Sequence, residues 1–346
     1  MNSIDLDRIK GWFLWKLFVA RKKVANVISY DKFGANDDVD STTTPEDLFG
    51  SNGIYTGINA TAGEAVQTIS TSPQDAGTLV TSGVSTGGSS VTIVDSGASF
   101  ITTTPISVGD CVINDTQSFH GIVVSVDSET QLTVARWDYD GDPEKIYSFN
   151  VGDSYRIATP NGTGVFVTLY TKLIESNYLS YIREYVILNG TTGVNTTGSD
   201  YIRNSRQIHI AFGTNLSSVG IIQSYQATTT SNIFTYIPVG HNQSLVGADT
   251  VIKGHTLYIT GAIAKLSRGN GGSGAADVDL LVRPINQGWN SKIHEYITDK
   301  SPFTTPDDYV LKVPEMADYK WQVQTCTDNN TKISGSTAGY LQKNNG

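Results

Sequence analysis

The sequence has little charge. Only 16% of its 346 residues are Asp, Glu, Lys or Arg, against about a quarter in an average soluble protein. The net charge is −9, and basic residues gather near the N-terminus, so the rest of the chain is more acidic still. An acidic surface repels phosphate groups, which argues against nucleic acid as a partner.

Cysteine and long apolar runs are also scarce. Cys111 and Cys326 form no CxxC pair and have no histidine at metal-ligand spacing, so we expect neither a zinc site nor a disulfide scaffold. No run approaches the roughly 18 apolar residues of a membrane helix. The apolar run 12–20 contains Lys16 and is followed by Arg21 to Lys23, where a signal peptide needs small residues. We therefore expect synthesis in a cytosol without export.

An aromatic and basic segment precedes the main body. Its apolar residues recur at steps of three and four, which predicts an amphipathic helix: Ile9, Trp12 or Phe13, Leu17, Ala20 and Val24. Three hypotheses compete for this helix, namely packing on the chain's own body, binding to a membrane surface and docking on another subunit. We favour docking, because residues 30–40 look like an extended connector that gives the helix reach.

The remaining residues are patterned as short β-strands bounded by Gly-, Asn- and Ser-rich turns. The clearest predicted strands are 91–94, 122–126, 165–169, 208–212, 256–260 and 277–282. This pattern predicts an all-β fold, with a jelly-roll-like β-sandwich body. We assign 1–50 to an N-terminal helix and extended anchoring arm, 51–87 and 161–346 to the main sandwich, and 88–160 to an inserted small β-barrel.

Several motifs resemble catalytic or ligand-binding signatures, but their context is wrong. The GxSxG pattern at 83–87 and the GxGxxG pattern at 269–274 are followed by no helix, so turns explain them better. The acidic run 138–142 lacks the glycine and glutamate of a calcium loop. The five histidines are scattered. The sequence therefore predicts no enzyme, no catalytic residue, no metal ligand and no cofactor.

A set of motifs in order along the chain resembles a family of structural proteins from tailed bacteriophages. The motifs are Lys32 to Gly34, Asn36 to Asp40, Pro45 to Phe49, Tyr55 to Gly57, Leu188 to Thr192, Tyr201 to Arg203, Gly240 to Ser244 and Val278 to Arg283. They are distributed along most of the chain outside 88–160. The resemblance implies a virion component without enzymatic activity, and it carries over no catalytic or ligand residue.

The resulting functional hypothesis is a virion protein that attaches by its arm and displays its body as a capsid decoration or head fibre. The predicted docking residues are Trp12, Phe13, Trp15, Phe18, Lys32, Phe33 and Gly34. The expected partners are the major capsid protein or tail and neck components. We expect a homo-oligomer, with a trimer favoured, in a virion assembled in the cytoplasm of a host bacterium.

Two other functions remain open. A tail, neck, baseplate or tail-fibre protein could bind host surface glycans, with Trp137, Tyr139 and Trp289 as candidates for stacking on sugars. A polysaccharide depolymerase would need paired carboxylates on a scaffold, and the sequence has no solenoid repeat to supply one.

Overall fold

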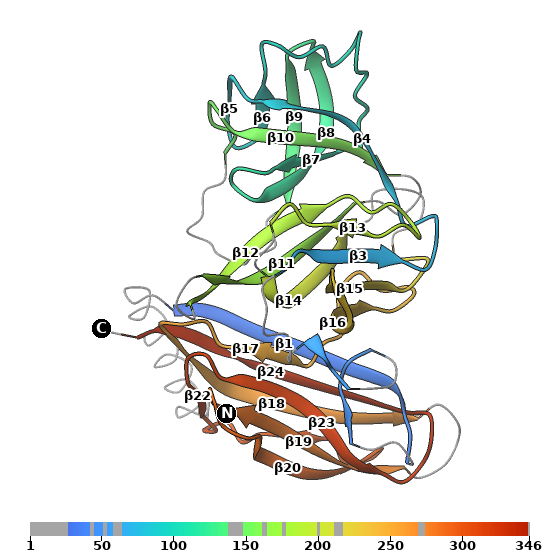
Figure 1. The fold of residues 1–346 in the computed structure, drawn as a ribbon, viewed down its shortest axis with the longest axis vertical. Helices are drawn as coiled ribbons and strands as arrows, with labels where there is room; N and C mark the ends of the chain where they lie inside the picture. Colours follow the sequence, from blue (N-terminus) through green and yellow to red (C-terminus); the bar gives the residue numbers. More distant parts are fainter. Residues whose placement is uncertain are drawn as a thin grey trace, which may run out of the picture.

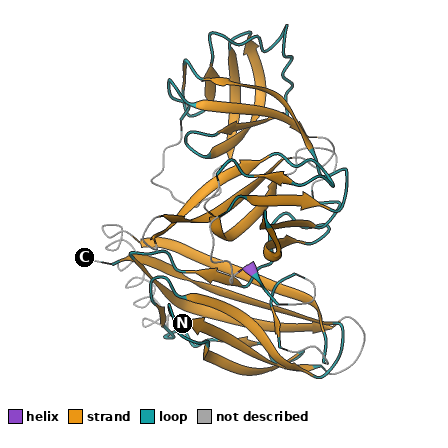
Figure 2. Ribbon diagram, in the orientation of Figure 1, coloured by secondary structure: helices purple, strands orange, loops and turns teal. Residues whose placement is uncertain are grey.

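The computed structural model describes residues 27–41, 45–50, 54–57, 64–137, 148–160, 165–174, 178–198, 201–210, 217–268 and 274–344. These residues form antiparallel β-sheets and contain no α-helix (Figure 1); the short purple piece in Figure 2 is a 3₁₀ turn. This confirms the predicted all-β fold. The same residues accordingly include no helix long and apolar enough to cross a membrane. The sheets form three units stacked along the longest axis of the molecule (Figure 1).

The unit at one end, which we call the basal unit, consists of two sheets around one core. One sheet holds β1 (Val27–Val39), β24 (Thr331–Lys343), β18 (His255–Arg268), β21 (Phe303–Thr304) and β22 (Leu311–Val313). The other holds β17 (Ala248–Thr250), β23 (Asp318–Cys326), β19 (Ala275–Arg283), β20 (Asn290–Thr298) and β2 (Glu46–Asp47). Alternating apolar residues of both sheets, such as Leu257 and Trp321, meet in this core.

The middle unit also has two sheets. They are formed by β12 (Tyr178–Val186), β11 (Val165–Ile174) and β14 (Tyr201–Ile210), and by β13 (Val194–Asn195), β3 (Val66–Ser70), β15 (Ile222–Gln226) and β16 (Thr229–Ile237). Val66, Tyr201 and Phe234 pack together and join the two sheets. Phe49 and Trp289 of the basal region pack with Tyr236 in a further cluster, which connects the middle unit to the basal unit.

The distal unit, at the opposite end from the basal unit (Figure 1), is one seven-stranded sheet. Its strands in order are β4 (Gly77–Val84), β10 (Ser154–Pro160), β7 (Cys111–Asn114), β8 (Phe119–Ser128), β9 (Gln131–Trp137), β6 (Thr92–Val94) and β5 (Gly87–Gly88). The first and last strands of this order, β4 and β5, follow each other in the chain, so the sheet curves back on itself. It encloses Ile93, Phe100, Phe119, Phe149 and Tyr155.

The structure differs from the predicted organisation in two places. The distal sheet begins at Gly77 rather than 88, because β4 pairs with β10 from Gly77 opposite Pro160. The residues assigned to one main sandwich are divided between two pairs of sheets. The chain passes from the basal unit to the middle unit and then to the distal unit, and returns in the reverse order.

The predicted connector is a strand of the basal unit. Residues 27–39 are extended, as expected, but they pair antiparallel with β24 from Val27 opposite Gln342 to Val39 opposite Thr331. Interpreting this segment as a free spacer was therefore wrong. Its partner strand, β24, lies at the other end of the sequence, where no local pattern indicates the pairing.

Candidate attachment site at the N-terminal strand

Motifs that carry the family resemblance meet around β1. The Asn36 side-chain amide donates to the Glu46 carboxylate at 2.9 Å and to the carbonyl oxygen of Asp47 at 3.3 Å. Glu46 in turn accepts from the backbone N–H of Asp40 at 3.0 Å. Asn36 and Glu46 are buried, so these hydrogen bonds satisfy polar groups that water does not reach. They fix the 45–47 segment against the end of β1.

Asp47 is the centre of a second buried group. Its carboxylate accepts from the backbone N–H of Tyr55 and from the amide of Gln322, both at 2.8 Å. The Lys320 ammonium lies 2.7 Å from the same carboxylate, and the two side chains are only 8% and 2% exposed for Lys320 and Asp47. A buried ion pair of this kind depends on both partners, because either charge alone would be left without solvation.

A third group lies under the middle of β1. The Lys32 ammonium is 3.8 Å from the Asp249 carboxylate, which also accepts from the Tyr30 hydroxyl at 2.7 Å. The Tyr30 hydroxyl also contacts the Tyr319 hydroxyl. Burial, together with the nearby Asp249 charge, raises the pKa of Tyr319. The phenol therefore stays neutral and remains a hydrogen-bond donor.

Glycine permits β1 to lie directly on the neighbouring backbone. A Cβ atom on Gly34 would come within 2.2 Å of the Gly247 nitrogen and 2.7 Å of the Leu48 carbonyl oxygen. Gly247 also exchanges backbone hydrogen bonds with Leu48 and Trp321. Only glycine fits this close approach, which places β1 directly against the residues that follow β2 and precede β17.

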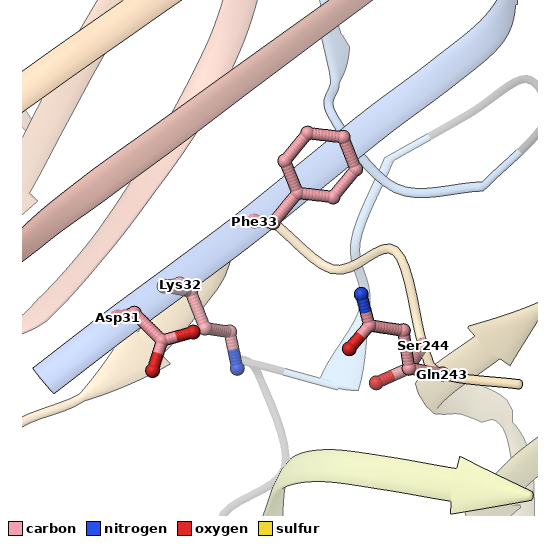
Figure 3. Close-up of a pocket in the computed structure, with 5 residues that line it drawn as sticks. All are labelled: Asp31, Lys32, Phe33, Gln243 and Ser244. Carbon is pink, nitrogen blue, oxygen red and sulfur yellow. The ribbon is translucent and has the colours of Figure 1, made fainter.

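A small cavity opens beside β1. It is lined by Asp31, Lys32, Phe33, Gln243 and Ser244 and measures about 30 Å³. Figure 3 shows Gln243 and Ser244 approaching from a loop across from β1. Small-molecule sites usually measure about 300–1,000 Å³, whereas one water needs about 10–15 Å³. The cavity therefore has room for water but not for a metabolite.

The structure separates the predicted docking residues. Lys32 and Gly34 are buried inside the basal unit, where they hold β1, while the Phe33 side chain is 41% exposed. Trp12, Phe13, Trp15 and Phe18 lie outside the described residues. Of the described candidates, Phe33 alone has an exposed large apolar side chain.

Sequence reasoning missed Asp47, Asp249 and Lys320. Charged residues that alternate with apolar ones are normally assigned to a solvent-facing side of a strand. Here residues distant in the sequence contact these side chains: Trp289 and Asp47 contact Lys320, and Lys32 and Tyr30 contact Asp249. The alternation around Lys320 was visible in the sequence, but these contacts were not.

The three aromatic candidates for sugar stacking can be placed only in part. Trp289 packs in the cluster between the basal and middle units, with the Arg283 guanidinium 4.7 Å and the Lys320 ammonium 5.0 Å from its ring. These contacts occupy the indole, which leaves little ring surface for a sugar. Tyr139 and the side chain of Trp137 lie outside the described part of the chain.

Some of the motifs that resemble catalytic or ligand-binding signatures lie in the described part of the structure. Ser85 lies at the bend between β4 and β5, and its buried hydroxyl donates to the carbonyl oxygen of Val94 at 3.1 Å. Cys111 and Cys326 are free and buried, and burial raises the pKa of the Cys111 thiol. The glycine run 269–273 and the acidic run 138–142 lie outside the described residues.

Within the described ranges, no group of three or more His, Cys, Asp and Glu side chains is placed to hold a metal ion. No protein-family model matches the sequence, and no curated protein matches it. The geometry thus defines an all-β protein whose buried polar groups fix the strand that follows the N-terminal segment.

Proposed function

We propose that this chain is a non-enzymatic virion structural protein of a tailed phage. It attaches through residues 1–26 and displays its β-rich body on the particle as a capsid decoration or head fibre. In this proposal the basal and middle units are stacked jelly-roll-like sandwiches, and the distal unit is a small barrel that points outward. The sequence resemblance to phage structural proteins is the first support.

The observation that carries the proposal is the position of β1. Residues 1–26 run directly into β1, which is fixed by its pairing with β24 and by the buried Lys32–Asp249 pair. The distal unit lies at the far end of the long axis (Figure 1). Attachment through the N-terminal segment would therefore hold the basal unit on the particle. The distal unit would remain exposed on the outside.

The partner in this proposal is the major capsid protein, and aromatic residues of the segment fill a groove on it. Tail or neck proteins are the second location. We expect the displayed body to be a homo-oligomer, with a trimer favoured. Contacts around Trp289 count against a glycan site at that residue, although not elsewhere on the body.

Deleting residues 1–26 tests the proposal, because it removes the segment and leaves β1 complete. We expect the truncated chain to fold, as judged by circular dichroism, and to lose its ability to rebind particles that lack this protein. Trp15→Ala combined with Phe18→Ala should reproduce the loss, whereas Asn2→Ala should not. Rebinding by the truncated chain at the full-length level would refute attachment through the segment, and electron microscopy of rebound particles would separate head from tail.

A further inference from the structure

Two buried pairs of a lysine and an aspartate lie in the basal unit. Lys320 pairs with Asp47, and Lys32 pairs with Asp249. In both pairs the lysine side chain is 8% exposed and the aspartate side chain is 2% exposed. Removing two charges from water in this way is costly. A lysine and an aspartate held together away from water can also condense to an amide, which removes both charges. The groups around each pair determine whether this reaction is open to it.

The groups around Lys320 and Asp47 keep this pair ionic. The Lys320 ammonium lies 2.7 Å from the Asp47 carboxylate and 5.0 Å from the Trp289 ring, and an aromatic face stabilises a positive charge. The carboxylate also accepts from the Tyr55 backbone N–H and from the Gln322 side-chain amide, both at 2.8 Å. An amide N–H donates a hydrogen bond but does not give up its proton. Among the described residues, no partner of Asp47 other than Lys320 can therefore protonate a leaving oxygen.

Asp249 has a different set of partners. The Tyr30 hydroxyl donates to its Oδ2 at 2.7 Å, and the Thr250 backbone N–H donates to its Oδ1 at 2.8 Å. A phenol, unlike an amide, can transfer its proton and take one back, as a general acid does. The Thr250 N–H is placed to stabilise a negative charge that develops on Oδ1. The Asp249 carboxyl group thus has a proton donor on one oxygen and an anion-stabilising donor on the other.

Lys32 approaches this carboxyl group from the opposite sheet. Lys32 lies in β1 and Asp249 lies in β17, so the pair bridges the two sheets of the basal unit. The Lys32 nitrogen is 3.8 Å from Oδ2 of Asp249. Bound groups react from separations of about 3–3.5 Å, and rotation of the flexible lysine side chain is sufficient to bring its nitrogen to the carboxyl carbon. Lys32 also lines the cavity of about 30 Å³ beside β1 (Figure 3), which has room for one released water.

We propose that Lys32 and Asp249 form an intramolecular isopeptide bond that joins β1 covalently to β17. The bond keeps β1 in the basal unit when the N-terminal segment is pulled, because β1 continues that segment. The inference goes beyond the proposed function, since it concerns a bond within the chain. Failure of the bond to form leaves attachment through residues 1–26 untouched, and failure to bind particles leaves the bond untouched.

The reaction needs no other reagent. The Lys32 ammonium first transfers a proton to the Asp249 carboxylate, and burial favours the resulting neutral amine and carboxylic acid. The Lys32 nitrogen then attacks the carboxyl carbon, the C–N bond forms, and Oδ1 becomes negative beside the Thr250 N–H. The bond from carbon to Oδ2 breaks as Tyr30 protonates the departing hydroxyl, and the surplus proton on nitrogen returns to Tyr30. An ammonium and a carboxylate thus become an amide and one water, without any oxidation or reduction.

The mass of the intact full-length chain tests the proposal. We expect the purified chain, denatured for mass spectrometry, to be lighter than its sequence by one water. Digestion should yield a branched peptide that joins residues 32 and 249, whereas residues 47 and 320 should remain in separate peptides. Lys32→Met should restore the full mass, and Lys265→Met, at an exposed position of the same unit, should keep the loss. A chain with the full sequence mass, a loss that maps elsewhere, or a loss that persists in Lys32→Met would overturn the proposal.

The rate of bond formation tests the role of Tyr30. Chains recovered unfolded in urea, before the bond has formed, are diluted into buffer and their mass is followed with time. Tyr30→Phe should react about a hundredfold more slowly, because it lacks the general acid. Tyr258→Phe, which removes a hydroxyl from the tyrosine stacked on Tyr340, should react at the original rate. Circular dichroism would establish that both variants fold. An unchanged rate in the folded Tyr30→Phe variant would overturn the assignment of Tyr30 as the proton donor.

Discussion

The distal and basal units each enclose a β core. The distal unit pairs strands that are close in the sequence, whereas the basal unit pairs strands from the two ends of the chain. Every strand pair of the distal unit lies within 77–160, and its ends pair with each other at Gly77 and Pro160. The basal unit pairs β1 with β24 and β2 with β23, so it closes only when both ends of the chain meet. Distant contacts form more slowly and require closure of long loops. We therefore infer that the distal unit folds independently, whereas the basal unit depends on the whole chain.

Among these substitutions, Lys320→Ala should produce the largest difference in stability between the two units. It leaves the buried Asp47 carboxylate without its cation, and removing one partner of a buried pair costs about 3–5 kcal/mol. We expect the basal unit to unfold at a lower urea concentration, while the distal unit keeps its own transition. Hydrogen exchange measured peptide by peptide reports both units in one sample.

A double variant provides the control for that loss. Lys320→Met with Asp47→Asn removes both charges and keeps an oxygen that can accept from the Tyr55 N–H. It should recover a large part of the stability lost in Lys320→Ala. If the double variant is as unstable as the single one, the ion pair is not the source of the effect.

Gly34→Ala should be the next largest perturbation, again confined to the basal unit. Its Cβ would lie 2.2 Å from the Gly247 nitrogen, and overpacking of this kind typically costs about 1–3 kcal/mol. Exchange of the β1 and β24 amides should accelerate, while that of 77–160 stays constant. Ser29→Ala, at an exposed position of the same strand, should have almost no effect. Unchanged β1 protection in Gly34→Ala would show that the strand shifts without cost.

Tyr155→Phe is the corresponding test of the distal unit. The Tyr155 hydroxyl donates to the Asp95 carboxylate at 2.7 Å, and burial with the nearby Asp95 raises the pKa of this hydroxyl well above its usual value. Loss of the bond should cost about 1–2 kcal/mol. The loss should be the same in the full chain and in an isolated 77–160 fragment, as measured by urea unfolding. Different losses would show that the rest of the chain supports the distal core.

The comparison also explains which features could be predicted from the sequence. The runs 122–126, 256–260 and 277–282 alternate or are continuously apolar over a few residues, and strands β8, β18 and β19 include them. Such local patterns determine the class of fold. The partner of β1 could not be found in this way, because nothing near residues 27–39 indicates a pairing with 331–343.

The buried polar groups were hidden for the same physical reason. Lys320 alternates with the apolar residues Tyr319 and Trp321, which predicts a solvent-facing side chain. The Trp289 ring lies 5.0 Å from the Lys320 ammonium and the Asp47 carboxylate lies 2.7 Å from it, and both residues come from other parts of the sequence. Phe33 is a predicted docking residue because it lies in the Lys32 to Gly34 motif that carries the resemblance, but its exposure follows only from its place in β1.

The smallest expected effect belongs to His294 on the edge strand β20. Its Nδ1 lies 2.6 Å from the Asp279 carboxylate, and this hydrogen bond, with the negative charge of Asp279, raises the pKa of His294. Asp277 and Glu295 act in the same direction. Because the folded pKa is raised, the stabilisation is complete below the unfolded value of about 6.5 and is lost as the pH rises through the folded pKa.

His294→Gln should therefore lower the free energy of unfolding at pH 5.5 but hardly change it at pH 8.5. The ring is largely exposed, so water and salt weaken the pair and the loss at pH 5.5 should stay below about 1 kcal/mol. Asp279→Asn should remove the same pH dependence, and the distal transition serves as an internal reference because it contains neither residue. A loss of equal size at both pH values would mean that His294 contributes through packing and not through its charge.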